Sequence, residues 1–227
     1  MSFFKVNTNE ENVKDYTGNG NNFLNNSGMY EVILKAVIAE TSPNGSNYIN
    51  LWIDHNGQEQ AIYQAIRLTN NDGSPNLGQK LFNKLAVICG ATEGQDIPDP
   101  VRRMVPIGEK GEEKECMVLE VFDDTPIIIR LQMEYYRYNE EIKDKKNIRN
   151  VFRFVDKATA AEIVNGTEVG KQYTMELEFA GKDDLKDGIT PEDVEVYKKN
   201  KRSNKKKETE TSIKPKGGFG GKKFGNK

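Results

Sequence analysis

The chain has 227 residues, of which 36% are hydrophobic and 30% are charged, and its formal net charge at pH 7 is -2. This length and composition suit one globular domain of ordinary size with polar extensions and argue against two large domains. The sequence has no apolar run near the roughly 18 residues of a membrane span and no signal-peptide pattern, so we expect a cytoplasmic protein without membrane contact.

The N-terminal third predicts an irregular arm followed by a sheet. Residues 1–27 are rich in asparagine, glycine and short polar side chains, which is typical of irregular structure. From Met29 onward apolar and polar residues alternate, and Asn-Gly pairs at 44–45 and 56–57 separate three such segments. Because Asn-Gly favours tight hairpin turns, we expect a three-stranded antiparallel meander. The first strand should have one inward row, made of Tyr30, Val32, Leu34, Ala36 and Ile38.

A helix should follow the third strand. Leucine and isoleucine recur at helical spacing over 77–88, and Gly90 is a suitable C-terminal stop. Residues 91–116 contain three prolines and many charges, so we expect them to be irregular. Strand character returns at 116–122.

The second half predicts a long hairpin. Its first strand is 126–138, and the return strand lies at about 147–155, with a polar tip between them. We expect a short helix over 158–164 and a last strand or extended segment over 172–179. Five or six strands with antiparallel hairpins, one intervening helix and no βαβ alternation favour a mainly β fold, an OB-like antiparallel barrel with one or two helices.

Aromatic and arginine side chains recur on the non-core rows of these strands. The run from Tyr48 to Asp54 alternates strictly, so Tyr48 and Trp52, the only tryptophan, share the face opposite Ile49, Leu51 and Ile53. Such a pair is either covered by another element or left for a ligand. The remaining candidates on neighbouring strands are Tyr63, Arg67, Tyr135, Tyr136, Arg137, Tyr138, Arg149 and Arg153.

This mixture of rings and cations is typical of single-stranded nucleic-acid binding. Unpaired bases stack on aromatic rings, at about 1–3 kcal/mol per base, and nearby cations bind the phosphates. The alternative is that the rings are core residues or cross-strand pairs that support a long hairpin.

The C-terminal residues differ from the rest of the chain in the sign of their net charge. Residues 198–227 hold eleven lysines and Arg202 against two glutamates, a net charge of +10, so residues 1–197 carry -12. We expect an acidic segment at 181–197 and a disordered basic tail at 198–227. The tail predicts nucleic-acid contact, with a docking peptide for another protein or a solvated extension as alternatives. The candidate contacts are Lys205, Lys206, Lys207, Phe219, Lys222, Lys223 and Phe224.

Catalytic motifs are missing from the sequence. It contains no phosphate-binding glycine loop, nucleophile elbow or zinc-protease motif. Cys89 and Cys116 are not in a CxxC arrangement, and His55 is the only histidine, so neither a disulfide framework nor a Cys/His zinc site is indicated. We expect no enzyme activity, no cofactor and no metal.

The layout resembles bacteriophage single-stranded DNA-binding proteins of the small OB-fold type. The resemblance is carried by the strand-turn-strand of 29–53, by Asn76-Leu77-Gly78 at the start of the helix, and by the paired strands 127–133 and 148–154, and it covers about 28–155. It implies an OB-like domain over 28–180 that coats single strands in phage DNA replication, recombination or repair. Replication or recombination proteins would be partners, in the cytoplasm of an infected bacterium, and an oligomer is compatible with this.

One departure concerns the C-terminus. Many replication single-strand binders end in an acidic tail that recruits partners, whereas this chain ends in lysine, glycine and phenylalanine. Two other functions fit the same residues. The first is a phage structural or assembly protein whose basic tail contacts DNA or another subunit, and the second is an accessory subunit of a polynucleotide-processing enzyme.

Overall fold

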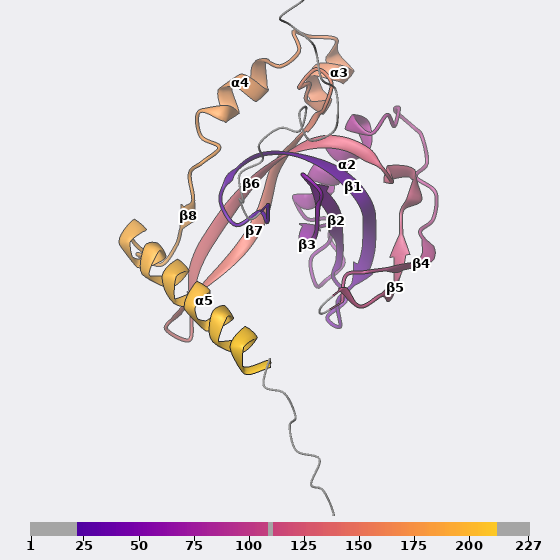
Figure 1. The fold of residues 1–227 in the computed structure, drawn as a ribbon. Coiled ribbons are helices and arrows are strands. Elements are labelled where there is room, and N and C mark those ends of the chain that lie inside the picture. The colour runs from indigo at the N-terminus through magenta and orange to yellow at the C-terminus, as the bar shows by residue number, and fades with distance from the viewer. Residues whose placement is uncertain (1–21, 109–110, 213–227) are drawn as a thin grey trace, which may run out of the picture. The chain divides into compact units, whose positions relative to one another are not determined.

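The computed structural model of the protein describes residues 22–108 and 111–212, and for 202–212 it describes the helical backbone only. The chain forms two compact units (Figure 1). The first comprises the chain up to Gln132 together with Lys146–Lys182, and the second comprises Met133–Lys145 together with the chain from Asp183 onward. The predicted N-terminal arm, 1–27, lies mostly outside the described residues.

The predicted meander is confirmed as β1 (Gly28–Thr41), β2 (Asn47–His55) and β3 (Gln58–Arg67), all antiparallel. The turn between β2 and β3 shows why the chain reverses direction at Asn56 and Gly57, whose φ values are 52° and 77°. Positive φ at both central residues is the geometry of the tight hairpin turn that Asn-Gly favours.

Strand β1 differs from the prediction in its side-chain rows. A register shift between Leu34 and Ala36 leaves Lys35 as an extra residue, a β-bulge. Because the bulge turns the strand over, Ala36 and Ile38 lie on the opposite face from Val32 and Leu34, and the single inward row predicted for this strand is wrong. Val37 now pairs with Leu51 on the core face, so three successive residues, Ala36, Val37 and Ile38, are all buried.

The second edge of β1 is shared by two other strands. Its first half, Gly28–Leu34, pairs with β6 (Thr125–Tyr138), and Ile38 and Ala39 pair with β5 (Lys114–Val118). Strand β4 (Val101–Val105) completes a hairpin with β5. The prediction that 91–116 is irregular was therefore wrong at 101–105 and 114–116. The short strand β4 lies between two prolines and has no apolar-polar alternation, so only its pairing with β5 reveals it.

The predicted strand at 116–122 is shorter than expected. It ends at Val118, and Glu120–Phe122 forms the 3-10 helix η2. Phe122 is buried and its ring packs edge-on against Phe82.

The strands form one mainly antiparallel sheet that is not closed. The pairing order is β3-β2-β1-β5-β4, with β6 also on β1 and β7 (Glu141–Arg153) on β6. No pairing joins β3, β4 or β7 to one another within the described ranges, so the structure is mainly β but a closed barrel is not shown. The predicted long hairpin β6–β7 is confirmed, but its return strand begins at Glu141 instead of about 147, so most of the expected polar tip is strand. The two strands contribute residues to both units.

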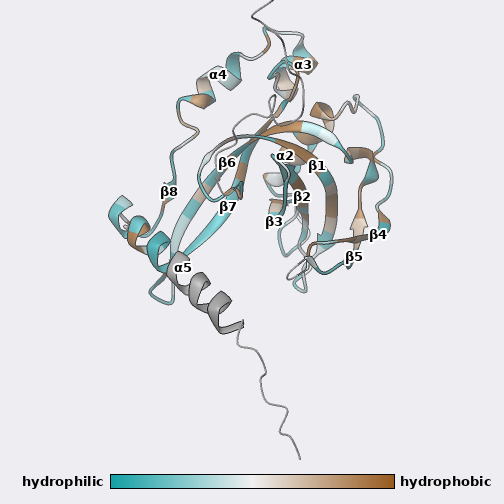
Figure 2. Cartoon of the chain, viewed as in Figure 1, coloured by the Kyte–Doolittle hydropathy of each residue, from teal (hydrophilic) through white to brown (hydrophobic). Residues whose placement is uncertain are grey.

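The predicted helix after β3 is confirmed as α2 (Gly78–Ile88), with Gly90 just beyond it at φ 98°. Its buried side chains are Leu85, Ala86 and Ile88. The helix start approaches β3 very closely, because a Cβ on Gly78 would lie 2.1 Å from the carbonyl oxygen of Arg67. Figure 2 shows hydrophobic residues concentrated along β1 and β2.

Two short helices follow β7 in the first unit. The predicted helix is confirmed as α3 (Ala160–Asn165), but the segment expected as a last strand is helix α4 (Lys171–Leu177). Glu176 is the buried residue of α4, and its carboxylate faces inward. This carboxylate accepts hydrogen bonds from three side chains, Arg130 at 3.0 Å, Asn150 at 2.7 Å and Gln172 at 2.9 Å. The prediction of a strand over 172–179 was therefore wrong, because helix α4 buries Glu176 and leaves its neighbours Met175 and Leu177 exposed.

In the second unit the acidic segment is partly ordered. Strand β8 (Asp184–Leu185) pairs in parallel with Glu134 and Tyr135 of β6. Helix α5 (Pro191–Ser212) begins in the acidic segment and continues into the basic stretch, so the prediction of disorder from Lys198 onward was wrong for 198–212. Residues 213–227 lie outside the described residues. None of the helices in the described part of the chain has the length and apolarity needed to cross a membrane.

Candidate nucleic-acid interface

The face that carries Tyr48 and Trp52 is divided by the β4–β5 hairpin. Register places Ala36, Ile38 and Glu40 of β1 beside Trp52, Asn50 and Tyr48 of β2, all on the face opposite the main core. One end of this face is covered and the other end is open. The sequence pattern left open whether the aromatic pair is covered by another element or open to a ligand. Both occur, at different residues of β2.

Trp52 lies at the covered end. Its ring is half-buried against a small apolar cluster of Ala36, Ile38, Val105 and Val118, together with Ile107 and Cys116. The indole Nε1 donates a hydrogen bond to the Glu59 carboxylate at 3.1 Å. Since β4 and β5 supply part of this cover, Trp52 packs the hairpin against the sheet.

Tyr48 lies at the open end, in a groove of about 220 Å³ that we call the β2–β3 groove. Its lining comes from β1, β2, β3 and the β4–β5 hairpin, and consists of Glu40, Tyr48, Asn50, Tyr63, Gln64, Ile107 and Lys114. The groove therefore joins two of the predicted aromatic residues, Tyr48 and Tyr63, and excludes Trp52.

A bulge in β3 directs Tyr63 to this groove. Ile49 pairs with Ile66 and Leu51 with Ile62, so three residues of β3 stand opposite Asn50 alone. The Asn50 side chain holds the bulge by accepting a 2.6 Å hydrogen bond from the Gln64 backbone, which has φ 48°. Bulges commonly re-aim a side chain. Here Tyr63 is 59% exposed, while its hydroxyl donates to the Ile107 carbonyl at 2.5 Å.

The polar groups of the groove are linked to one another. Asn50 is buried and donates from its Nδ2 to the Glu40 carboxylate at 2.6 Å. Burial, and then the neighbouring Glu40 carboxylate, raises the pKa of the Tyr48 phenol above its ordinary value. The phenol stays protonated at neutral pH beside Glu40.

Arg67 pairs with Tyr48 in register, but its guanidinium is engaged with two loops. Its Nε donates to the Thr69 carbonyl at 3.1 Å, and its Nη2 donates to Ser46 Oγ at 3.0 Å and to Asn71 Oδ1 at 2.7 Å. Arg67 therefore joins the turn after β1 to the loop after β3. The guanidinium donors of Arg67, which the sequence pattern predicted to bind phosphate, are thus used within the protein.

The two arginines predicted on β7 belong to the first unit and are also partnered. Arg149 is exposed and donates to the Gln132 side chain at 2.6 Å. Arg153 forms a two-pronged pair with Asp156, at 2.9 and 2.5 Å, across the turn after β7. Neither side chain lines the β2–β3 groove.

The predicted aromatic cluster of 135–138 lies in the second unit, and one member is corrected. Tyr135 is only 1% exposed, with Tyr197 edge-on at 6.1 Å and the Lys198 ammonium 5.5 Å from its ring centre. It continues the inward row of Ile127, Ile129, Leu131 and Met133, so its ring cannot stack on a base. Tyr136 is half-buried, and Arg137 and Tyr138 are exposed.

The beginning of the basic stretch is tied down within the second unit. Lys201 pairs with Asp144 at 2.5 Å, and Tyr197 donates to the same carboxylate, while Lys198 lies 3.6 Å from Asp183. The side chains of Lys205, Lys206 and Lys207 lie outside the description of α5. Phe219, Lys222, Lys223 and Phe224 lie outside the described residues, so these predicted contacts stay predictions.

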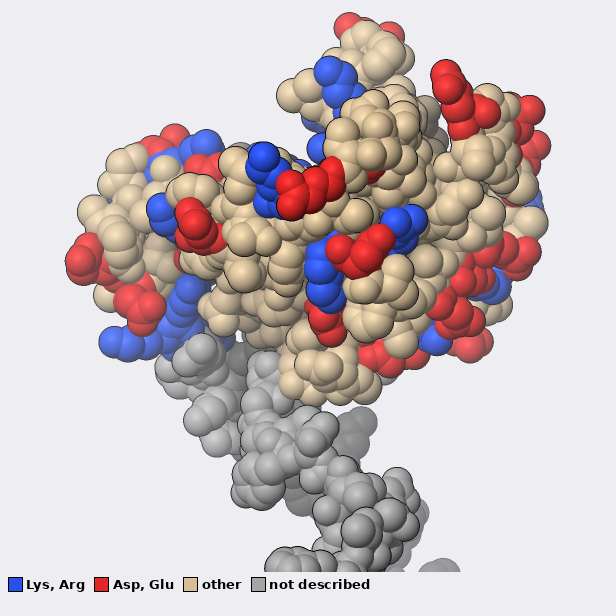
Figure 3. Space-filling model, turned by 90° about the horizontal axis from the view of Figure 1, so that it is seen from above, with Lys and Arg blue, Asp and Glu red and all other residues tan. Residues whose placement is uncertain are grey.

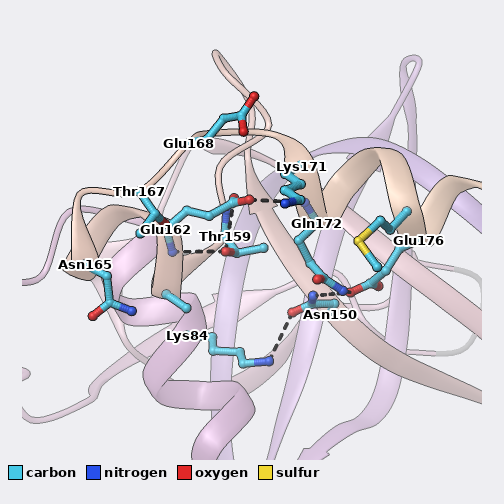
Figure 4. A pocket seen from close by; sticks show the side chains of 12 residues that line it. Lys84, Asn150, Thr159, Glu162, Asn165, Thr167, Glu168, Lys171, Gln172 and Glu176 are labelled. Carbon is cyan, nitrogen blue, oxygen red and sulfur yellow. Dashed lines mark hydrogen bonds between the residues drawn. The ribbon is translucent and has the colours of Figure 1, made fainter.

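A second hollow of the first unit, of about 540 Å³, lies among α2, β7, α3 and α4 (Figure 4). Its two buried carboxylates are already satisfied by protein donors. Glu162 completes a capping box with Thr159 and also accepts from the backbone of Gly170 and Gln172, and Glu176 has the three partners described above. The polar groups of this hollow thus hold α3 and α4 in place.

Sequence reasoning missed several groove residues for identifiable reasons. Glu40 stands directly opposite Tyr48 across the first hairpin, so the turn position could have revealed it. Lys114 and Ile107 come from the hairpin that was expected to be irregular, and no local pattern signals them. Within the described ranges, no group of three or more His, Cys, Asp or Glu side chains could hold a metal ion. No protein-family model matches the chain, and no curated protein matches it either.

Proposed function

We propose that this protein binds and coats single-stranded DNA, with the β2–β3 groove as a base-stacking site and the basic C-terminal residues as phosphate contacts. The main support is that two tyrosine rings, Tyr48 and Tyr63, line one groove whose floor is a buried asparagine. The Tyr63 hydroxyl is bonded to the Ile107 carbonyl and the Tyr48 side chain is half-buried, so the rings are pre-positioned. Ordered rings lose little conformational freedom when a base stacks on them.

The position of the groove also supports the proposal. Oligonucleotides bind OB-folds, which are partly open barrels, on the face of strands 2 and 3 and at neighbouring loops. The unclosed sheet is compatible with this architecture, and the OB-like interpretation forms part of the proposal. Arg67 braces the two loops beside the groove through Ser46, Thr69 and Asn71.

Charge is distributed in a way that favours single strands. On the face drawn in Figure 3, the described lysines and arginines are mixed with acidic side chains. Duplex binding depends on neutralising many phosphates, which a mixed surface does poorly. The basic residues after Lys201 provide the general attraction to phosphate. The biological role that follows is coating of single strands during phage DNA replication, recombination or repair, without catalysis.

A binding titration tests the proposal. Labelled oligonucleotides of about 16 nucleotides, the upper site size of one OB-fold, are titrated with protein and followed by anisotropy, with duplex as competitor. Tyr63→Leu removes one ring and should weaken binding about tenfold, since one stacked base contributes about 1–3 kcal/mol. Phe179→Leu is the matched control, because this ring is 47% exposed in the same unit but lies outside the groove. Equal binding by all three proteins, or no preference over duplex, would contradict the proposal.

One observation favours the alternative of a structural or assembly protein. Helix α4 and its flank expose Met175, Leu177 and Phe179, at 54%, 52% and 47%, while Glu176 points inward. Several exposed apolar side chains within one short segment are typical of protein interfaces. If this alternative holds, the protein should self-associate without DNA, and Leu177→Glu should abolish the association in light scattering while oligonucleotide binding stays absent.

A further inference from the structure

The rim of the β2–β3 groove carries one charge of each sign. Glu40 is exposed at the end of β1, and Lys114 is exposed at the start of β5. Neither side chain forms an ion pair with another described residue. Both act on the same neighbour, since burial and then Glu40 raises the pKa of the Cys116 thiol whereas Lys114 lowers it. A carboxylate and an ammonium therefore border the site where the tyrosine rings would hold a base.

A carboxylate is an unusual group on a surface that attracts phosphates. Glu40 would repel the backbone of a single strand, so its place in a stacking groove needs another partner with N–H donors. An ionised carboxylate has about four acceptor sites. Asn50 uses one of them, at 2.6 Å, and holds the group in position, which leaves acceptor capacity toward the open side.

The exposed edge of a nucleobase supplies such donors. Cytosine and guanine carry an amino group together with a carbonyl oxygen on one edge, and adenine has the amino group without the carbonyl. Thymine has no amino group, and its one ring N–H lies between two carbonyl oxygens that repel a carboxylate. A carboxylate accepts from an amino group, and an ammonium donates to a carbonyl. The groove volume of about 220 Å³ is below that of ordinary drug-sized sites, as expected for one base.

We propose that the β2–β3 groove is a base-selective position for cytosine or guanine, in which Glu40 accepts from the amino group and Lys114 donates to the carbonyl oxygen. The inference rests on the proposed function, because it requires that a base enters the groove. It adds that binding is not uniform along a strand, and that pyrimidine runs of cytosine are bound more tightly than runs of thymine.

Homopolymer titrations test the selectivity. The wild-type chain should bind oligo-dC at least about fivefold more tightly than oligo-dT, since one charged contact to a base discriminates by about 1 kcal/mol or more. Glu40→Gln keeps an acceptor for Asn50 but loses the charge and gains a donor for thymine, so the ratio should fall to below about twofold. Lys114→Gln should reduce the preference for oligo-dC over oligo-dA by the same reasoning.

The control is Glu115→Gln, which removes the same charge from the next residue of β5 outside the groove lining. It should change the affinity for all homopolymers equally and keep the ratio. A wild-type ratio near one, or a ratio unchanged in Glu40→Gln, would overturn the selectivity while single-strand binding itself persists. Failure of the wild-type chain to bind any homopolymer would instead overturn the proposed function together with this inference.

Discussion

The contact between helix α2 and strand β3 leaves no room for a side chain at Gly78. A Cβ at this position would lie 2.1 Å from the Arg67 carbonyl oxygen, 2.8 Å from its carbonyl carbon and 3.0 Å from its nitrogen. These are backbone atoms, which cannot rotate away as a side chain would. Gly78→Ala must therefore push the helix from the strand that positions Tyr63 and Arg67.

The expected magnitude follows from two opposing effects. Alanine is favoured over glycine inside a helix by up to about 1 kcal/mol. Overpacking of a close contact costs about 1–3 kcal/mol, and more where backbone must move. We expect a net loss of at least about 2 kcal/mol in the free energy of unfolding, which for a chain of this size lowers Tm by about 4–8 °C.

Thermal unfolding followed by the fluorescence of Trp52, on the strand next to β3, measures the effect. Gly181→Ala is the matched control, because a Cβ there meets no atom within 4 Å and its φ is not left-handed. That variant should be unchanged or slightly stabilised, by about 0.4–1 kcal/mol. A Gly78→Ala variant as stable as wild type would refute the close approach of α2 to β3.

Two further predictions concern pH and salt. Burial tends to raise the pKa of Glu162, but hydrogen bonds from Thr159, Gln172 and Gly170 outweigh it and hold the pKa below its ordinary value of 4.5. The stability from this group is present above that value and lost as the pH falls through the lower folded-state pKa. Thermal unfolding of Glu162→Gln should therefore show a smaller drop in Tm between neutral and acid pH than wild type shows. An equal drop in Tm would contradict a stabilising contribution from the ionised Glu162 carboxylate. Deletion of 213–227 removes five lysines, so the slope of log affinity against log salt for a single strand should shrink by up to about 3.5, whereas an unchanged slope would exclude tail contacts.

Local chemistry predicted most of the strands and the two helices α2 and α3. The Asn-Gly turns, the alternation over β1–β3 and the leucine spacing of α2 identified the meander and its helix because each signal acts over a few residues. The prediction was wrong where contacts between segments distant in the sequence determine the secondary structure. Helix α4 buries Glu176 because Arg130 and Asn150 donate hydrogen bonds to its carboxylate. Residues 101–105 form strand β4 because they pair with β5.

The candidate site shows the same division. Alternation placed Tyr48 and Trp52 on one face of one strand, and this is determined by backbone geometry alone. Their environments differ because the bulge at Lys35 turns Ala36 and Ile38 toward Trp52, where the β4–β5 hairpin covers them. The bulge opposite Asn50 brings Tyr63 to Tyr48, and Lys114 arrives from a distant segment. The sequence by itself determined which residue types share a strand face, while long-range pairing decided which of them are covered and which remain open to a ligand.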